Sequence, residues 1–492
     1  MRGGDAYASP RLSDAYSDIL KSTSWNQYNH NFNATLLQET AFNSNSAGAF
    51  ECWSSHYDRI RRENEFLRDA AEFGSKFGED WLKIRIAEVR FCRAYAYFML
   101  CRVYGGVILR TEVDGPEQND KARSTEEECW GFIINELKEL APDLPLKWDS
   151  DNSGRATQKA AYGLLSRVAL YAEKWDVAAQ AARDCATAEG NLDLSENGYA
   201  KIFELGINSP EVLFAVEFKS SVIDHAYDAY VRPSGDTKEL GKQVYSGFVP
   251  TSELVDSYEM AGDGGNFSWE KHGKDPYANR EPRFYATILY NGADWMGRKI
   301  ESFVGGKDGY KAYENAGAAG TTVTGYYLRK YLIDGDKTWV TSGSGQDWIV
   351  LRYAEVLLNK AEALAMENWN KNSAEALQAL NDVRARVGLP ARATADKETF
   401  LEYVRHERKV ELAGEGFRYW DLRRWRLAEK VIDGQNVHGV KISKQSDGSF
   451  TYEQVDADGG HKRIFYDRYY RFAIPLSERS NNSLCTNNDG WI

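Results

Sequence analysis

The stretch TQKAAYGLLSRVALYAEKWDVAAQAARDCATA, residues 157–188, decides the fold of this chain. It divides into two helix-like segments, 157–173 and 176–188, which meet at Lys174 and Trp175. Small residues recur on the two faces that would touch, at the three- and four-residue spacing of a helix. They are Ser166, Ala169, Ala178 and Ala182. Because small side chains let two helix axes approach closely, the stretch predicts a packed antiparallel helix pair.

The same spacing is typical of tetratricopeptide (TPR) repeats, in which helix pairs stack side by side. A second pair is predicted where an apolar stripe over 350–364 is followed by another over 377–387, and Gly388 ends it. Further helices are predicted at 53–71, 81–103, 125–140 with Ser124 as cap, and from about 397 to 431. The fold class predicted is therefore mainly α, with a TPR-like scaffold.

The residues between the two helical blocks have a different composition, rich in Gly, Asn, Asp and aromatic residues. They include short runs in which apolar and other residues alternate, such as 212–218. This composition predicts a loop-rich subdomain with minor β structure, and an insertion of this length normally serves function. We predict four regions. They are an N-terminal helical region (1–189), a loop-rich binding insertion (190–345), C-terminal TPR-like helices (346–431) and a loop-rich segment packed on the insertion (432–492).

The charge, cysteine content and aromatic content of the chain limit the functions that can be expected. The 492 residues include 61 Lys plus Arg against 73 Asp plus Glu, a net charge of −12, and a nucleic-acid partner is not expected because phosphate binding needs a basic surface. The six cysteines form no CxxC pair, so buried free thiols are expected. The 14 Trp, 29 Tyr and 21 Phe exceed what a core usually needs, which suggests that some rings lie at a binding surface.

No catalytic or metal motif is predicted. Glu407, Glu411 and Glu415 recur every four residues with arginines nearby (Arg408, Arg418 and Arg424), a pattern that favours ion pairs between helices. Two carboxylates on one helical face cannot flank a sugar as a glycosidase pair does. His406 and Glu407 begin like the zinc motif HExxH, but its second histidine is absent. The residues from Asp149 resemble the start of a calcium-binding loop, but the glutamate that such a loop needs is absent, so we predict a helix-capping turn at Asp149. The sequence thus predicts no metal and no cofactor.

Several blocks of sequence occur in an order that resembles the SusD/RagB family of glycan-binding outer-membrane lipoproteins of Bacteroidetes. The blocks lie at 53–64, 87–107, 254–264, 281–288, 351–358, 380–390, 407–425 and 474–491, and together they extend over nearly the whole chain. Glu281 stands where the family more usually has Asp.

The resemblance implies a non-catalytic protein that captures an oligo- or polysaccharide at the cell surface and delivers it to a SusC-like TonB-dependent transporter. It also implies anchoring in the outer membrane through an acylated N-terminal cysteine. Because the first cysteine here is Cys52, that anchor is expected to lie outside this sequence. Two other functions stay open: an all-helical glycoside hydrolase, and a TPR adaptor that binds peptides in its helical groove.

The candidate glycan-binding residues are loop aromatics with polar neighbours, because a pyranose has an apolar face and a polar rim. Trp295 is the leading platform, since Asp294 and Arg298 flank it in a Gly-containing loop. The further candidates are Trp269, Tyr277, Tyr310, Phe42, Asn43 and Asn45. By contrast, Trp81 and Trp425 lie at helical spacing and are predicted to belong to the core.

Overall fold

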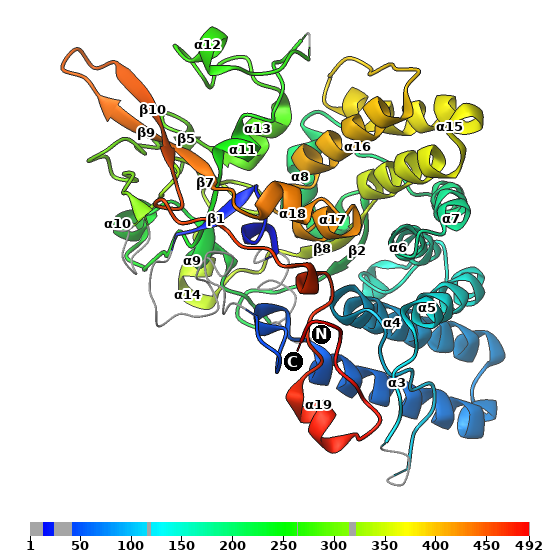
Figure 1. Cartoon of the computed structure of the whole chain (residues 1–492). Coiled ribbons are helices and arrows are strands. Elements are labelled where there is room, and N and C mark those ends of the chain that lie inside the picture. Colours follow the sequence, from blue (N-terminus) through cyan, green and yellow to red (C-terminus); the bar gives the residue numbers. More distant parts are fainter. Residues whose placement is uncertain (1–12, 24–41, 116–119, 263, 314–320, 492) are drawn as a thin grey trace.

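The computed structural model describes residues 13–23, 42–115, 120–262, 264–313 and 321–491 (Figure 1). Paired helices form one side of the molecule, and short strands, short helices and loops form the other (Figure 1). The predicted mainly-α fold with a TPR-like scaffold and minor β structure is confirmed. No helix in these ranges is both long and apolar enough to cross a membrane.

The scaffold is a stack of helices in which each packs on the next. Its members are α3 (Trp53–Phe73), α4 (Glu79–Tyr104), α5 (Glu126–Leu140), α6 (Gln158–Tyr171), α7 (Trp175–Thr187), α15 (Tyr353–Arg386) and α16 (Lys397–Glu411). After the insertion the chain returns to the stack, because α15 packs on α7 and α6. The pair predicted from residues 157–188 is therefore the centre of the scaffold.

Two details of the helices differ from the predicted ones. The cap of α5 is Thr125 and not Ser124: the Thr125 hydroxyl accepts the backbone N–H of Glu128, whose carboxylate accepts the Thr125 N–H. The single block predicted for 397–431 is three helices, α16, α17 (Arg418–Arg424) and α18 (Ala428–Ile432). The second predicted pair is confirmed, with its two helices meeting at Asn368, where φ is −163°.

The loop-rich half contains five small sheets within the described ranges, each of two antiparallel strands. The pairs are β1 (Leu20–Ser22) with β3 (Phe248–Pro250), β2 (Val212–Val216) with β8 (Trp348–Arg352), β4 (Ile288–Leu289) with β7 (Tyr327–Leu328), β5 (Asp294–Trp295) with β6 (Arg298–Lys299), and β9 (His438–Lys444) with β10 (Phe450–Asp456). Because β2 pairs with β8, the insertion leaves and rejoins the scaffold at one place.

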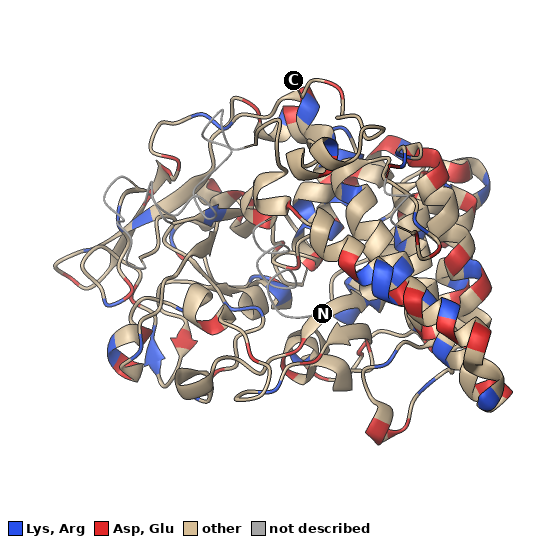
Figure 2. Cartoon of the chain, turned by 90° about the horizontal axis from the view of Figure 1, so that it is seen from below, with Lys and Arg blue, Asp and Glu red and all other residues tan. Residues whose placement is uncertain are grey.

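Short helices connect these strands. They are α8 (Gly198–Leu205), α9 (Tyr227–Val231), α10 (Asp236–Leu240), α11 (Ser252–Val255), α12 (Trp269–His272), α13 (Pro282–Thr287), α14 (Trp339–Ser342) and, near the C-terminus, α19 (Leu476–Asn481). Acidic and basic residues are interspersed along the scaffold helices, whereas much of the loop-rich half is uncharged (Figure 2).

The structure resolves four expectations about side chains. Cys92 is exposed, so the prediction of buried thiols is wrong for it, while the other five cysteines are buried and free. Trp81, predicted to be core, is 49% exposed at the first turn of α4. Trp425 is half-buried. The Asp149 carboxylate caps a short turn by accepting the N–H of Asn152, as predicted.

Candidate functional site

The repeating glutamates at the end of α16 and just beyond it belong to a buried ion-pair network, as their spacing predicted. Glu407, Glu411 and Glu415 are all buried. Arg283 donates to Glu407 at 2.5 Å and to Glu411 at 2.9 Å, and Arg352 donates to Glu411 at 2.6 Å and Glu415 at 2.7 Å. Against the opposing effect of burial, the surrounding arginines hold the pKa of Glu411 well below its usual range. These carboxylates are enclosed and fully paired, so they hold α16 against the insertion and β8.

The arginines that the sequence suggested as their partners pair elsewhere. Arg408 and Arg424 both bind Asp421, and Arg418 binds Asp18. The arginine partners of these glutamates come instead from α13 and the end of β8, far away in the sequence, and from the end of α15, where Arg384 pairs with Glu407 and Arg386 with Glu411. Helical spacing identified the network, but it could not identify which distant arginines complete it.

Trp295 is fully buried, which corrects the prediction that it is the leading sugar platform. Its indole N–H donates to Asp236 at 3.0 Å, and the Arg232 guanidinium lies 5.2 Å from the ring centroid. Successive side chains of a strand point to opposite faces, so β5 turns Asp294 to solvent and Trp295 inward. No face of this indole is available to a ligand.

Asp294 and Arg298, the two polar residues predicted to flank a sugar on Trp295, point to different places in the structure. Asp294 is exposed and pairs with Lys299 at 2.7 Å across the β5–β6 hairpin. Arg298 instead binds two buried carboxylates, Asp236 at 2.8 Å and Asp308 at 2.6 Å. Arg298 is therefore a structural side chain, and the expected arrangement of acid, ring and base does not form.

Two further predicted rings are in the core. Phe42 is 2% exposed and packs 4.5 Å from the ring of Phe472, and Tyr277 is 6% exposed and packs 4.6 Å from the ring of Tyr290. The prediction of surface platforms is wrong for both. Tyr310 is half-buried.

The predicted asparagines are accessible but lie far from the other candidates. Asn43 and Asn45 are exposed and share a tight turn, in which the Asn43 side-chain oxygen accepts the Asn45 N–H at 2.9 Å. The carbonyl of Asn45 accepts the N–H of Leu476 at the start of α19. Since α19 and α12 lie at opposite ends of the molecule, the asparagines and Trp269 do not form one site (Figure 1).

Trp269 is the predicted indole that keeps an accessible surface. It is half-buried at the start of α12, and its N–H donates to Asp256 at 2.9 Å. Its ring lies 6.0 Å from that of Tyr452 on β10. Burial raises the pKa of Asp256 to about 6, while the hydrogen bond from Trp269 opposes that rise. The indole is thus held in place at its polar edge while part of the ring stays open.

A stacked tyrosine pair in the insertion was not predicted. The rings of Tyr230 and Tyr245 lie 5.1 Å apart at an interplanar angle of 26°, and Tyr245 is 42% exposed. The backbone holds the pair firmly, because the N–H of Tyr245 donates to Ala229 at 2.7 Å and that of Gly247 to Tyr230 at 2.6 Å. Neither tyrosine stands in a distinctive motif, so no sequence signal marked them.

A cavity of about 500 Å³ lies in the same part of the insertion. Its wall includes Asp228 of α9, Asp336, Gln346 and the rings of Phe218 and Tyr331. Burial raises the pKa of Asp228. Since α9 carries both Asp228 and Tyr230, one short helix connects this cavity to the tyrosine pair. Carboxylate, amide and ring surfaces are the groups that recognise sugar hydroxyls and faces.

Metal ligands do not gather in the part of the chain that the structure describes, where no group of three or more His, Cys, Asp or Glu could hold an ion. The features available for binding are therefore rings, hydrogen-bonding side chains and charges.

Comparison with known proteins identifies the scaffold. The family model of the SusD family matches residues 210–491. The chain belongs to the SusD family. A second family model, described as starch-binding associating with outer membrane, matches residues 4–170.

Individual SusD-family relatives resemble the chain over most of its length. A SusD-like protein of Bacteroides ovatus is 26% identical, with 86% of this chain and 74% of that protein covered. A SusD-like protein of Bacteroides fragilis, known from its crystal structure, has a TM-score of 0.84 at 28% identity, with coverages of 98% and 94%. A SusD-like carbohydrate binding protein from the same species has a TM-score of 0.81 at 25% identity, with coverages of 96% and 92%.

Most of the blocks that resemble the SusD family lie in the scaffold, whereas blocks 254–264 and 281–288 lie in the insertion. Blocks 281–288, 351–358 and 407–425 supply Arg283, Arg352 and the glutamates of the buried network. The accessible rings Tyr230, Tyr245 and Trp269 all lie outside the blocks. These blocks thus include much of the charged core and leave out the accessible rings.

Proposed function

We propose that this protein is a non-catalytic glycan-binding protein that captures an oligo- or polysaccharide at the outer cell surface and delivers it to a SusC-like TonB-dependent transporter. Membership of the SusD family carries the proposal, supported by the similarity along nearly the whole chain to a SusD-like carbohydrate binding protein. The rigid helical stack positions the insertion, and the insertion binds the sugar.

Trp269 and the Tyr230–Tyr245 pair are the proposed platforms. Stacking a pyranose on one ring buries about 50 Å² of apolar area, which contributes on the order of 1 kcal/mol at about 25 cal/mol/Å². Two or three such contacts contribute about 2–3 kcal/mol, and hydrogen bonds to the sugar hydroxyls have to supply the rest of the roughly 4–8 kcal/mol that correspond to millimolar to micromolar affinity. Such an affinity lets a surface receptor release its ligand to a transporter.

A glycan microarray followed by titration calorimetry tests the proposal. We expect Trp269→Ala and Tyr245→Ala each to weaken binding of the glycan found by about fivefold or more, since 1.4 kcal/mol corresponds to a factor of ten. Trp81→Ala is the matched control, because Trp81 is also an accessible indole but lies on the scaffold. A loss of binding in Trp81→Ala with none in the other two would place the site on the helices and contradict the proposal.

The absence of catalysis is tested separately. Incubation of the protein with the same glycan should release no new reducing ends, because the paired glutamates of α16 are buried in ion pairs. Appearance of shorter products would instead favour a glycoside hydrolase. Binding of peptides in place of glycans would favour the TPR adaptor.

Delivery and anchoring rest on the family alone. The transporter encoded nearest to this chain should co-purify with it from outer membranes. The precursor should incorporate labelled fatty acid and be cleaved by protease added to whole cells. A protein that stays protected inside intact cells would contradict the surface location.

A further inference from the structure

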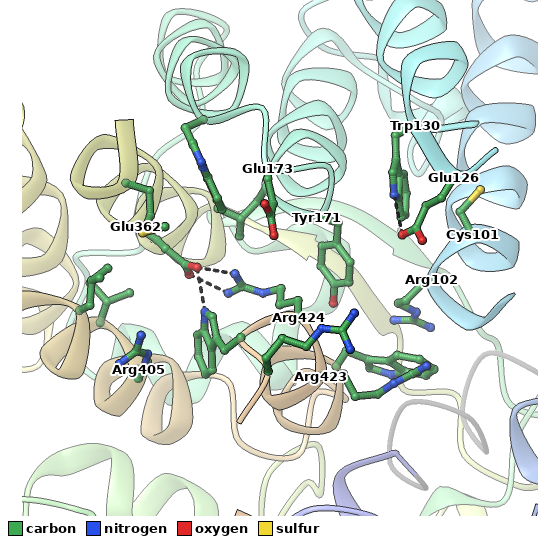
Figure 3. A pocket seen from close by; sticks show the side chains of 18 of the residues that line it. Cys101, Arg102, Glu126, Trp130, Tyr171, Glu173, Glu362, Arg405, Arg423 and Arg424 are labelled. Carbon is green, nitrogen blue, oxygen red and sulfur yellow. Dashed lines mark hydrogen bonds and ion pairs between the residues drawn. The ribbon is translucent and has the colours of Figure 1, made fainter. Parts of the chain in front are cut away.

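A second cavity, of about 380 Å³, lies within the helical scaffold. Helices α4, α5, α6, α7, α15, α16 and α17 all contribute to its wall, and no residue of the insertion does. Figure 3 shows Arg102 and Glu126 at one end of this scaffold cavity and Glu362 and Arg405 at the other. It is therefore separate from the rings proposed above.

The scaffold cavity is basic although the chain carries a net charge of −12. Three glutamates, Glu126, Glu173 and Glu362, line it together with six arginines. The arginines are Arg102, Arg405, Arg423, Arg424, Arg426 and Arg471. Two of the glutamates are already occupied: Glu362 accepts from Arg424 and Trp425, and Glu126 from Arg471 and Trp130.

Four of these arginines, Arg102, Arg405, Arg423 and Arg426, form no ion pair with a carboxylate among the described residues, whereas Arg424 and Arg471 do. Arg423 and Arg102 are the two that share one aromatic neighbour. Arg423 is 4% exposed, and its Nη2 donates to the Tyr470 carbonyl at 2.7 Å, while Nε and Nη1 have no acceptor. Arg102 makes one hydrogen bond there, from Nη2 to the Met99 sulfur at 3.3 Å, and its Nε has no acceptor. Both guanidinium groups lie against Trp420, 4.7 and 4.3 Å from its ring centroid.

The pKa of Arg423 is lowered because no counter-charge offsets its burial. Burial, together with the neighbouring Arg471 and Arg102, lowers the pKa of Arg423 to about 10. Arg424, only one residue away, shows the opposite behaviour, because Glu362 and Asp421 outweigh burial and raise its pKa. A buried cation without a partner is costly, and the usual remedies are a counter-charge or a bound anion.

The remaining wall suggests what kind of anion fits. Tyr171, Trp175 and Trp425 supply ring surfaces, and Glu173 at the rim supplies a hydrogen-bond acceptor. The volume falls in the range of about 300–1,000 Å³ that is typical of small-molecule sites, so a sugar unit fits better than an extended protein segment. Guanidinium groups are well suited to carboxylate and sulfate oxygens.

We propose that the scaffold cavity is a second saccharide site, which binds an acidic sugar through the carboxylate of a uronate or the sulfate ester of a sulfated unit. The oxyanion would lie beside Arg102 and Arg423, and the sugar ring against the aromatic wall. The choice of a saccharide rests on the proposed function, whereas the choice of an anion rests on the unpaired arginines. The site would let one protein hold neutral and acidic parts of a glycan separately.

Calorimetry on the intact chain tests this proposal with glucuronate, glucose 6-sulfate, glucose and inorganic sulfate as probes. We expect one or both acidic sugars to bind at least tenfold more tightly than glucose and inorganic sulfate. Arg102→Gln should weaken that binding at least tenfold and leave the neutral glycan of the insertion unaffected. Arg68→Gln is the charge-matched control, since Arg68 is a surface residue of α3 paired with Asp69.

Arg423→Gln gives a second readout that does not depend on a ligand. Removing an unpaired buried charge should leave the melting temperature unchanged or raise it, whereas loss of a structural ion pair would lower it. Equal binding of inorganic sulfate and acidic sugars, an Arg102→Gln variant that binds like the wild type, or binding of an acidic peptide in place of the sugars would each overturn the proposal. Failure of the neutral glycan to bind, with acidic sugars still dependent on Arg102, would overturn the proposed insertion site alone.

Discussion

The indole nitrogen of Trp295 donates a 3.0 Å hydrogen bond to the carboxylate of Asp236, and neither residue has any exposed surface. Asp236 also accepts from Arg298, which in turn binds Asp308. The ring and the three charges therefore form one buried unit that joins the β5–β6 hairpin to α10. Its contribution is to the stability of the insertion.

Replacing Trp295 should accordingly affect folding before binding. Trp295→Ala removes a fully buried indole, and we expect the free energy of unfolding to fall by about 3–5 kcal/mol. The fraction that remains folded should bind glycan with an affinity within about twofold of the wild type. Chemical denaturation and calorimetry measure the two quantities. A stable variant with no binding would mean that the ring contacts the ligand after all.

The buried network offers a sharper test of charge pairing. Arg352 contacts Glu211, Glu411 and Glu415, so Arg352→Met leaves three buried carboxylates short of a partner, and we expect a loss of about 3–5 kcal/mol. The double variant Arg352→Met/Glu415→Gln should recover part of that loss, because it removes one of the buried carboxylates that lose Arg352 as a partner. Additive losses in the double-mutant cycle, measured by denaturation, would show that Arg352 and Glu415 do not stabilise one another.

The helices could be predicted because their signals are local. Apolar spacing, small residues at helix contacts and terminal glycines located α4, α6 and α7 to within about three residues. The glutamates of α16 were also recognisable as structural from their four-residue repeat.

The binding surface could not be predicted in the same way, because exposure of a loop ring depends on contacts from distant segments. Trp295 is buried by Asp236 and Arg232, some 60 residues before it, whereas Tyr245 is left open although its neighbours look unremarkable. The glycines and charged residues that flank Trp295 in the sequence indicate a hairpin. They do not indicate which side of the hairpin faces solvent. The unpaired arginines of the scaffold cavity could likewise not be predicted from the sequence, because only the fold brings Arg102 and Arg423 together.

Two glycines, one just after α4 and one inside α5, should respond oppositely to alanine. A Cβ at Gly106, just after α4, would lie 2.4 Å from the carbonyl oxygen of Ser124, so Gly106→Ala should cost about 1–3 kcal/mol. Gly131 lies inside α5, and no atom lies within 4 Å of the place that an alanine methyl would take, so Gly131→Ala should stabilise the protein by up to about 1 kcal/mol. Thermal melts of the two variants check both signs. Equal shifts would show that the Gly106 contact relaxes freely.

The carboxyl group of Asp14 should make the protein less stable as the pH rises. The side chain is fully buried and accepts the backbone N–H groups of Gly416 and Arg418 at 3.0 and 3.1 Å. Burial outweighs these bonds and raises the pKa of Asp14 from 3.8 to about 7. The folded state therefore binds this proton more tightly than the unfolded state does. The contribution of Asp14 to stability is complete below about pH 4 and is lost as the pH rises through 7.

A matched variant separates Asp14 from the other titrating groups. Carboxyls such as Glu259, where Arg384 outweighs burial and lowers the pKa, lose stability toward acid and act in the opposite direction. The comparison is therefore between the wild type and Asp14→Asn, which keeps an oxygen acceptor but does not ionise. As the pH rises from 5 to 8, the wild type should lose stability relative to Asp14→Asn, and most of the change should fall below pH 7. Denaturation curves that stay parallel across this range would show that Asp14 does not titrate there.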